Sequence, residues 1–223
     1  MDSLINLPLF PLRSVVVPFM ELPLHIFEDR YKQLLRDCLA GDRRFGVLLI
    51  REGAEVGGSA EPYGVGTVVE ITEVQDLPTG GFKIVAMGRQ RFRVTQLWRD
   101  RPYLRCHGVT LPELPGDPEA ARAFDGQVRL LTAEYVAAVY TMIGEDGRRP
   151  VGLPDDSLTL SYAVVMLLSV HMVEAQALLE APTVTERLAL EDDLLRRELA
   201  ILRQMRQGRP RLPKTDNPRY SPN

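Results

Sequence analysis

The chain has 223 residues, of which 45% are apolar and 26% charged, and its formal net charge is −3. This composition excludes collagen-like, low-complexity and wholly disordered proteins. Two cysteines, Cys38 and Cys106, are too few for a disulfide framework or a four-thiolate zinc site, so we expect a reducing, cytoplasmic environment. No apolar run approaches the ~20 residues of a spanning helix and the N-terminus lacks a basic leader, so we expect no membrane partner.

The first 115 residues are rich in short β-like runs punctuated by glycine and proline. Because proline cannot donate to a sheet ladder, Pro8 and Pro11 predict that residues 4–12 form an edge strand or an extended arm. Apolar residues at three- and four-residue steps predict a helix from about residue 27 that ends at Gly41. Further strands are expected at residues 45–50, 65–74, 82–94 and 103–111. Together these elements favour an α+β fold that begins with a partly open antiparallel barrel.

The sequence Leu-Pro-Gly-Asp-Pro at residues 114–118 marks an internal boundary. We therefore expect a β-rich domain at 1–115, an α-helical bundle at 116–207 and a flexible Pro/Arg-rich tail at 208–223. Within the bundle, Thr183 and Glu186 have the spacing of a capping box. The helix that follows carries leucines at seven-residue steps, and this seam either packs within the bundle or joins a weak homodimer. The seam consists of Leu188, Leu195 and Leu202.

The motifs that carry catalytic chemistry are missing. None of the three lysines follows a glycine, so the chain has no Walker A loop. His25, His107 and His171 lie far apart and outside any HExxH pattern, so we predict neither a metal site nor a cofactor. Residues 191–193, Glu-Asp-Asp, lie beside arginines and are interpreted as a solvated helix face. The sequence therefore predicts a non-enzymatic protein.

One surface candidate is basic and consists of odd-numbered residues of the strand expected at 82–94. These residues are Lys83, Arg89, Arg91 and Arg93. They form either the solvent face of the sheet, where cations discourage edge pairing, or a contact for an anion or a nucleic acid. The net charge of −3 disfavours nucleic acid without excluding it.

A second surface candidate is apolar and is kept out of regular structure by two prolines. Its members are Val17, Phe19, Met20, Leu22 and Leu24. If part of this segment faces solvent, it forms the kind of patch that binds other proteins, and a flexible thioether adapts to varied partners. A third hypothesis is a small-ligand pocket between barrel and bundle. Its walls would include Tyr63, Trp98 and Tyr103.

Three segments resemble signatures of the Lon protease N-terminal domain. The first joins Leu-Pro-Leu-Phe-Pro-Leu at 7–12, Val-Pro at 17–18 and Glu-Leu-Pro-Leu-His-Ile-Phe-Glu-Asp-Arg-Tyr at 21–31. Residues 64–67 with 71–74 resemble the second signature, and residues 88–94 the third. The three occur in the family's order, and a weaker similarity continues to about Gln204.

The resemblance implies a PUA-like barrel followed by a helical bundle, a region that recognises unfolded or tagged substrates in the full protease. It also implies that Glu21, Arg30 and Tyr31 help to fix the barrel. The chain leaves no room for the ATPase and Ser/Lys peptidase modules, so we expect a stand-alone substrate-binding-domain protein. The leading hypothesis is a module that binds exposed apolar segments of unfolded or client proteins, with a cellular protease as a further partner. The alternative is an RNA- or anion-binding barrel.

Overall fold

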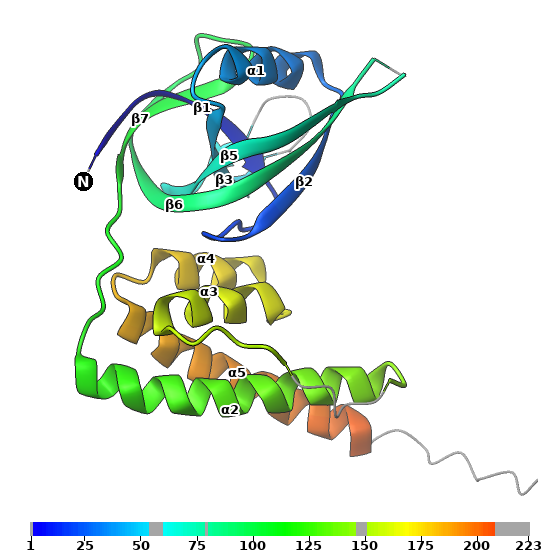
Figure 1. Ribbon diagram of the computed structural model, residues 1–223, viewed down its shortest axis with the longest axis vertical. Helices are drawn as coiled ribbons and strands as arrows, with labels where there is room; N and C mark the ends of the chain where they lie inside the picture. Colours follow the sequence, from blue (N-terminus) through cyan, green and yellow to red (C-terminus); the bar gives the residue numbers. More distant parts are fainter. Residues whose placement is uncertain (1, 54–59, 79, 146–150, 208–223) are drawn as a thin grey trace, which may run out of the picture.

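The computed structural model describes residues 2–53, 60–78, 80–145 and 151–207. The predicted tail at 208–223 and parts of the expected loops lie outside these residues. In chain order the elements are β1 (Ser3–Leu12), β2 (Glu21–Ile26), α1 (Asp29–Ala40), β3 (Arg44–Glu52), β4 (Glu61–Pro62), β5 (Val65–Asp76), β6 (Phe82–Trp98), β7 (Leu104–Thr110), α2 (Pro118–Met142), α3 (Ser157–Leu167), α4 (Met172–Glu180) and α5 (Val184–Gln207). Figure 1 shows three layers: the strands with α1, then α3 with α4, then α2 with α5.

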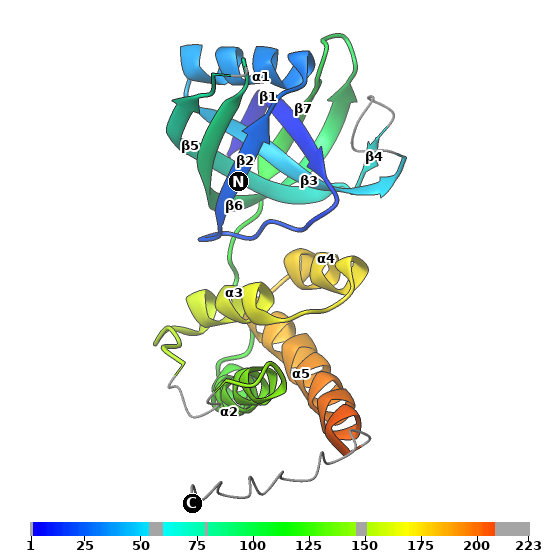
Figure 2. The same ribbon diagram turned by 90° about the vertical axis from the view of Figure 1, so that its right-hand side faces the viewer.

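The strands curl into a barrel in which β1, β7, β6, β5 and β3 follow one another as neighbours. β3 returns to β1 through four parallel pairs, from Leu9–Gly46 to Leu12–Leu49. The other pairings are antiparallel, and α1 lies across one end of the barrel (Figure 2). The α+β class is confirmed, but the barrel closes through the parallel pairing of β1 with β3, whereas the sequence predicted an antiparallel barrel.

The prediction that β1 is an edge strand is wrong, because β1 has two neighbours. Those neighbours pair with different halves of it: β7 with Ser3 to Leu9, and β3 with Leu9 to Leu12. Pro8 therefore faces a partner only in β7, and Pro11 only in β3. Each proline lies where one side of the strand is unpaired among the described residues, and proline is tolerated in a strand when its nitrogen faces such a side.

β2 lies in the segment whose two prolines predicted an absence of regular structure. It pairs antiparallel with the first half of β6 along its whole length. Leu22 and Ile26 point into the barrel core, whereas Glu21, Pro23 and His25 are exposed. Residues 21–26 alternate between apolar inward-facing and exposed positions, as in a strand. Pro23 lies within this segment, and proline argues against a strand.

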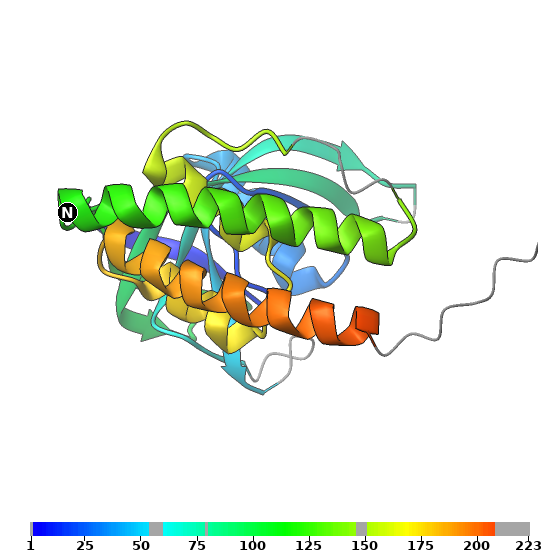
Figure 3. The same cartoon turned by 90° about the horizontal axis from the view of Figure 1, so that it is seen from below.

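The helical unit has its own core, in which α2 and α5 run side by side (Figure 3). Leu188 and Leu195 are buried there and Leu202 is partly buried, so the leucine seam packs within the bundle. The capping box of Thr183 and Glu186 is confirmed by reciprocal hydrogen bonds. Helix α4, which begins after His171, was not predicted. Among the described helices, none combines the length and apolar character needed to cross a bilayer.

Candidate functional site at the barrel–bundle junction

A tight turn at residues 17–20 leads into β2 and lies beside α3. Phe19 has a φ of 68°, a backbone conformation that side-chain-bearing residues rarely adopt. The turn is fixed by hydrogen bonds from Phe19 N–H to the Gly88 carbonyl (2.9 Å) and from Gly88 N–H to the Met20 carbonyl (2.8 Å). A Cβ atom at Gly88 would lie 2.2 Å from the Val17 carbonyl oxygen, so only glycine allows this approach.

The turn holds the ring of Phe19 out from the core, with 49% of the residue exposed. Its ring centroid lies 6.0 Å from that of Tyr162 on α3, at an interplanar angle of 57°. Phe19 thus lies where the barrel meets the bundle.

The five apolar residues of the predicted binding segment have different environments. Val17 and Leu22 are buried, in the barrel–bundle and barrel cores respectively, so neither offers surface to a partner. Met20 and Leu24 are half-buried and pack against the core, and Phe19 is exposed. Any patch on this segment therefore consists of Phe19 with parts of Met20 and Leu24.

A buried ion network behind the turn fixes the barrel to the bundle. The Arg91 side chain on β6 donates through Nε and Nη2 to the Glu113 carboxylate (2.8 and 3.1 Å). Its remaining N–H groups donate to the carbonyls of Pro112, Leu179 and Ala181. All five donors of the guanidinium are therefore satisfied, and the charge of this buried arginine is compensated.

Glu113 also receives two groups from the bundle. The Tyr162 hydroxyl donates to it at 2.6 Å, and Arg187 Nη2 lies 3.3 Å away. The Arg187 guanidinium carbon stacks 4.1 Å from the Tyr162 ring centroid. Burial opposes ionisation of Glu113, but the hydrogen bonds from Arg91 and Tyr162 and the charges of both arginines outweigh it and lower its pKa.

The predicted basic stripe is not a continuous surface. Arg91 is buried in the network above, because β-bulges interrupt the pairing of β5 with β6 and strict alternation fails. Arg89 is exposed and pairs with Glu70 at 2.9 Å. In the described part of the chain, only Lys83 and Arg93 of the four are exposed without a partner. No sequence signal indicated that Arg91 joins the barrel to the bundle.

The three signature residues differ in burial. Tyr31 is buried and stacks on Phe10, with ring centroids 3.9 Å apart. Arg30 lies over the Tyr31 ring at 4.3 Å and pairs with Glu28 at 3.0 Å. Glu21 is exposed on β2.

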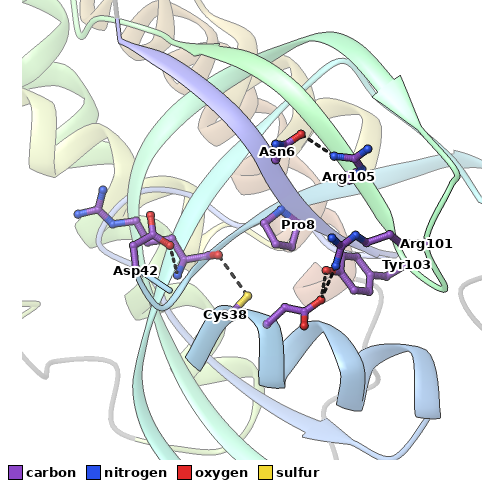
Figure 4. Close-up of a pocket in the computed structure, with 9 residues that line it drawn as sticks. Asn6, Pro8, Cys38, Asp42, Arg101, Tyr103 and Arg105 are labelled. Carbon is purple, nitrogen blue, oxygen red and sulfur yellow. Dashed lines mark hydrogen bonds and ion pairs between the residues drawn. The ribbon is translucent and has the colours of Figure 1, made fainter. Parts of the chain in front are cut away.

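A cavity of about 260 Å³ lies between α1, β1 and β7, on the barrel itself (Figure 4). Tyr103 donates to Asp37, which also pairs with Arg101 at 3.0 Å; these bonds, led by that from Tyr103, lower the pKa of Asp37. Burial raises the pKa of the Cys38 thiol to about 12, so this sulfur is not a nucleophile at neutral pH. Tyr103 thus lines a cavity, but not one between barrel and bundle.

Of the residues at 191–193, which were predicted to form a solvated face, only Asp193 is exposed. Glu191 is completely buried, and neither carboxylate oxygen has a hydrogen-bond partner among the described residues. It lies three residues after Leu188 and four before Leu195, which places it on the buried face of α5. This spacing from the leucines could have predicted that Glu191 is buried, but the neighbouring charged residues suggested an exposed face.

The fold is shared with solved Lon N-terminal domains. A crystal structure of a Lon N-terminal domain protein from Xanthomonas campestris has a TM-score of 0.60 and 26% identity, and the match covers 85% of this chain and 96% of that one. The N-terminal domain of the Mycobacterium avium complex Lon protease has a TM-score of 0.59 at 19% identity, covering 87% of this chain and 98% of that one.

The family model described as the ATP-dependent protease La (LON) substrate-binding domain matches residues 6–197. The chain therefore belongs to this family of substrate-binding domains. It is 29% identical over 88% of its length to a Lon protease of Desulfovibrio desulfuricans, and 30% identical over 87% to Lon protease 1 of Thermus thermophilus. The match spans 22% and 25% of those relatives, so the chain corresponds to about a quarter of their length.

Proposed function

We propose that this chain is a recognition module that binds exposed apolar segments of unfolded or client proteins without catalysing a reaction. The family supports recognition of protein substrates, and the match lies in the substrate-binding domain. The contact surface consists of Phe19 with the exposed parts of Met20 and Leu24.

The conformation of Phe19 carries this proposal. A left-handed backbone costs a side-chain-bearing residue roughly 1 kcal/mol or more, and because Phe19 is 49% exposed, it forgoes roughly half of the 1.5–3 kcal/mol that complete burial supplies. Folding alone would favour glycine at this position. Strain of this kind is concentrated at functional sites, where a partner covers the exposed group.

The test is binding of a fluorescently labelled, reduced and unfolded model protein, followed by anisotropy. Phe19→Asp should weaken binding by about tenfold, as loss of an aromatic anchor does. The matched control is Leu130→Asp, since Leu130 on α2 is 70% exposed but belongs to another element. Equal loss in both variants, or no binding by the unaltered chain, would refute the proposed surface.

A second variant separates binding from folding. Phe19→Gly relieves the left-handed strain but also removes the ring contact with Tyr162; because these effects oppose each other, the unfolding free energy should change by less than about 1 kcal/mol while binding weakens. Urea titrations measure the stability of the same protein samples. A glycine variant that binds as well as the unaltered chain would show that the ring has no part in recognition.

A further inference from the structure

Strand β2 presents an edge that no other described strand covers. Among the strands that the structure describes, it pairs with β6 alone, on one side (Figure 1). The Gly88 N–H bonds to the Met20 carbonyl, and bonded pairs alternate along antiparallel strands. Leu22, Leu24 and Ile26 therefore direct their backbone groups to β6. The backbone groups of Glu21, Pro23 and His25 point to the open edge, where they offer three carbonyls and two N–H donors.

The position of Pro23 agrees with this assignment. Proline has no N–H, and it is tolerated in a strand where its nitrogen faces away from the paired neighbour. Pro23 also leaves a gap in the donor row, which discourages tight association of two such edges. The edge therefore retains acceptors for a bound chain while one donor is missing.

Exposed aromatic side chains stand at both ends of this edge. Phe19 precedes β2, and Phe27, which follows it, is 58% exposed and contacts His25 with ring centroids 5.9 Å apart. The six residues between Phe19–Met20 and Phe27 span about 20 Å in an extended strand. An apolar contact at each end and backbone hydrogen bonds between them match an extended segment of about six residues, and not a helix, whose backbone groups are already paired.

Charged residues beside the edge favour a basic residue at one end of the bound segment. Glu21 has no ion-pair partner among the described residues, whereas His25 lies opposite Lys83 on β6. A basic side chain opposite Glu21 gains a cross-strand attraction, and one beside His25 does not. Side chains opposite Leu22, Leu24 and Ile26 lie on the barrel side of the added strand, so alternate residues should be apolar.

We infer that the free edge of β2 binds its client by strand addition, and that the substrates are extended, proline-free segments with apolar residues at alternate positions and a basic residue at one end. This inference rests on the proposed function and specifies its binding mode. The hydrogen-bonding groups come from the backbone of both partners, so varied sequences are accepted.

The test uses a labelled peptide, Lys-Val-Thr-Val-Thr-Val-Lys, and two series of its single backbone N-methylated forms, at the valines or at the other residues. Because only alternate residues of an added strand bond to the edge, one series should lose about tenfold in affinity and the other no more than about twofold. Which series is sensitive reports whether the strand is antiparallel or parallel. Equal sensitivity in both series would overturn strand addition.

A variant of the chain provides the complementary measurement. Pro23→Thr restores the missing edge donor without altering the residues that bond to β6, so peptide affinity should rise severalfold. If Phe19→Asp weakens capture of the unfolded protein while the N-methylated series behave alike, the proposed function stands and strand addition fails. If the unaltered chain binds neither the unfolded protein nor the peptide, both fail.

Discussion

Glu191 is a buried carboxyl group without a hydrogen-bond partner among the described residues. Burial raises its pKa well above the ordinary value, and the charge of Arg187 opposes this only in part. The group is therefore protonated in the folded state over a pH range in which it ionises in the unfolded chain. It follows that Glu191 weakens the fold progressively as the pH rises above about 4.3, until the folded pKa is reached.

Glu191→Leu should stabilise the protein, because it removes an unsatisfied polar group from an apolar core. The gain is about 1–3 kcal/mol in unfolding free energy from the lost desolvation penalty alone, and it should grow as the pH rises. Urea unfolding of both proteins at several pH values between 4.5 and 8 measures the difference. A difference that is constant over this range would contradict a raised pKa.

At the scale of elements, the contact of β6 with α3, α4 and α5 depends on the network around Glu113. Arg91→Ala leaves that carboxylate with Arg187 as its only cation, so we expect a loss of about 3–5 kcal/mol in unfolding free energy. The control is Arg89→Ala, two residues earlier on the same strand, which breaks an exposed pair and should cost less than about 1 kcal/mol. Similar losses in the two variants would show that the buried network does not hold the elements together.

The pH dependence of this network has the opposite sign to that of Glu191. The pKa of Glu113 is lowered by folding, so its stabilising contribution is complete above the unfolded pKa of about 4.3 and is lost as the pH falls through the lower folded value. The contact between β6 and the helices should therefore loosen in acid.

Sequence periodicity predicted the elements whose burial follows one regular spacing. Helix α1 and the capping box before α5 are examples, because spacing along the chain determines both. β2 was missed because a proline interrupts its alternation, and Arg91 was misplaced because a bulge upstream changes which residues face outward. Of the predicted apolar segment, the sequence could not separate Phe19 from Val17, since their different exposure depends on a turn that Gly88 closes from another strand.

At the scale of the whole molecule, barrel and bundle share a core. One apolar cluster contains Val17 and Val65 from the barrel together with Tyr162, Leu178 and Leu179 from the helices. Gln176 Nε2 on α4 also donates to the Val65 carbonyl at 3.0 Å. Because these contacts are lost if either unit opens, the two should unfold together.

Cooperativity is measured with two probes in one urea titration. Trp98, the single tryptophan, reports on the barrel by fluorescence, and far-UV circular dichroism at about 222 nm reports mainly on the helices. We expect coincident transitions in the unaltered chain and separate ones in Arg91→Ala. Two transitions in the unaltered chain would show that the shared core does not couple the units.

The antiparallel pairing of β1 with β7 sets a condition on synthesis. Ser3 pairs with Val109, so the first half of β1 waits for its partner until more than a hundred further residues have been translated, roughly 5–20 s at 5–20 residues per second. Leu4 and Leu7 pair only with β7 among the described strands, so they remain without a partner strand on the nascent chain during that interval. A protein whose proposed task is to bind apolar segments therefore exposes an apolar segment of its own during translation. Shielding of that segment by a chaperone would favour correct closure of the barrel.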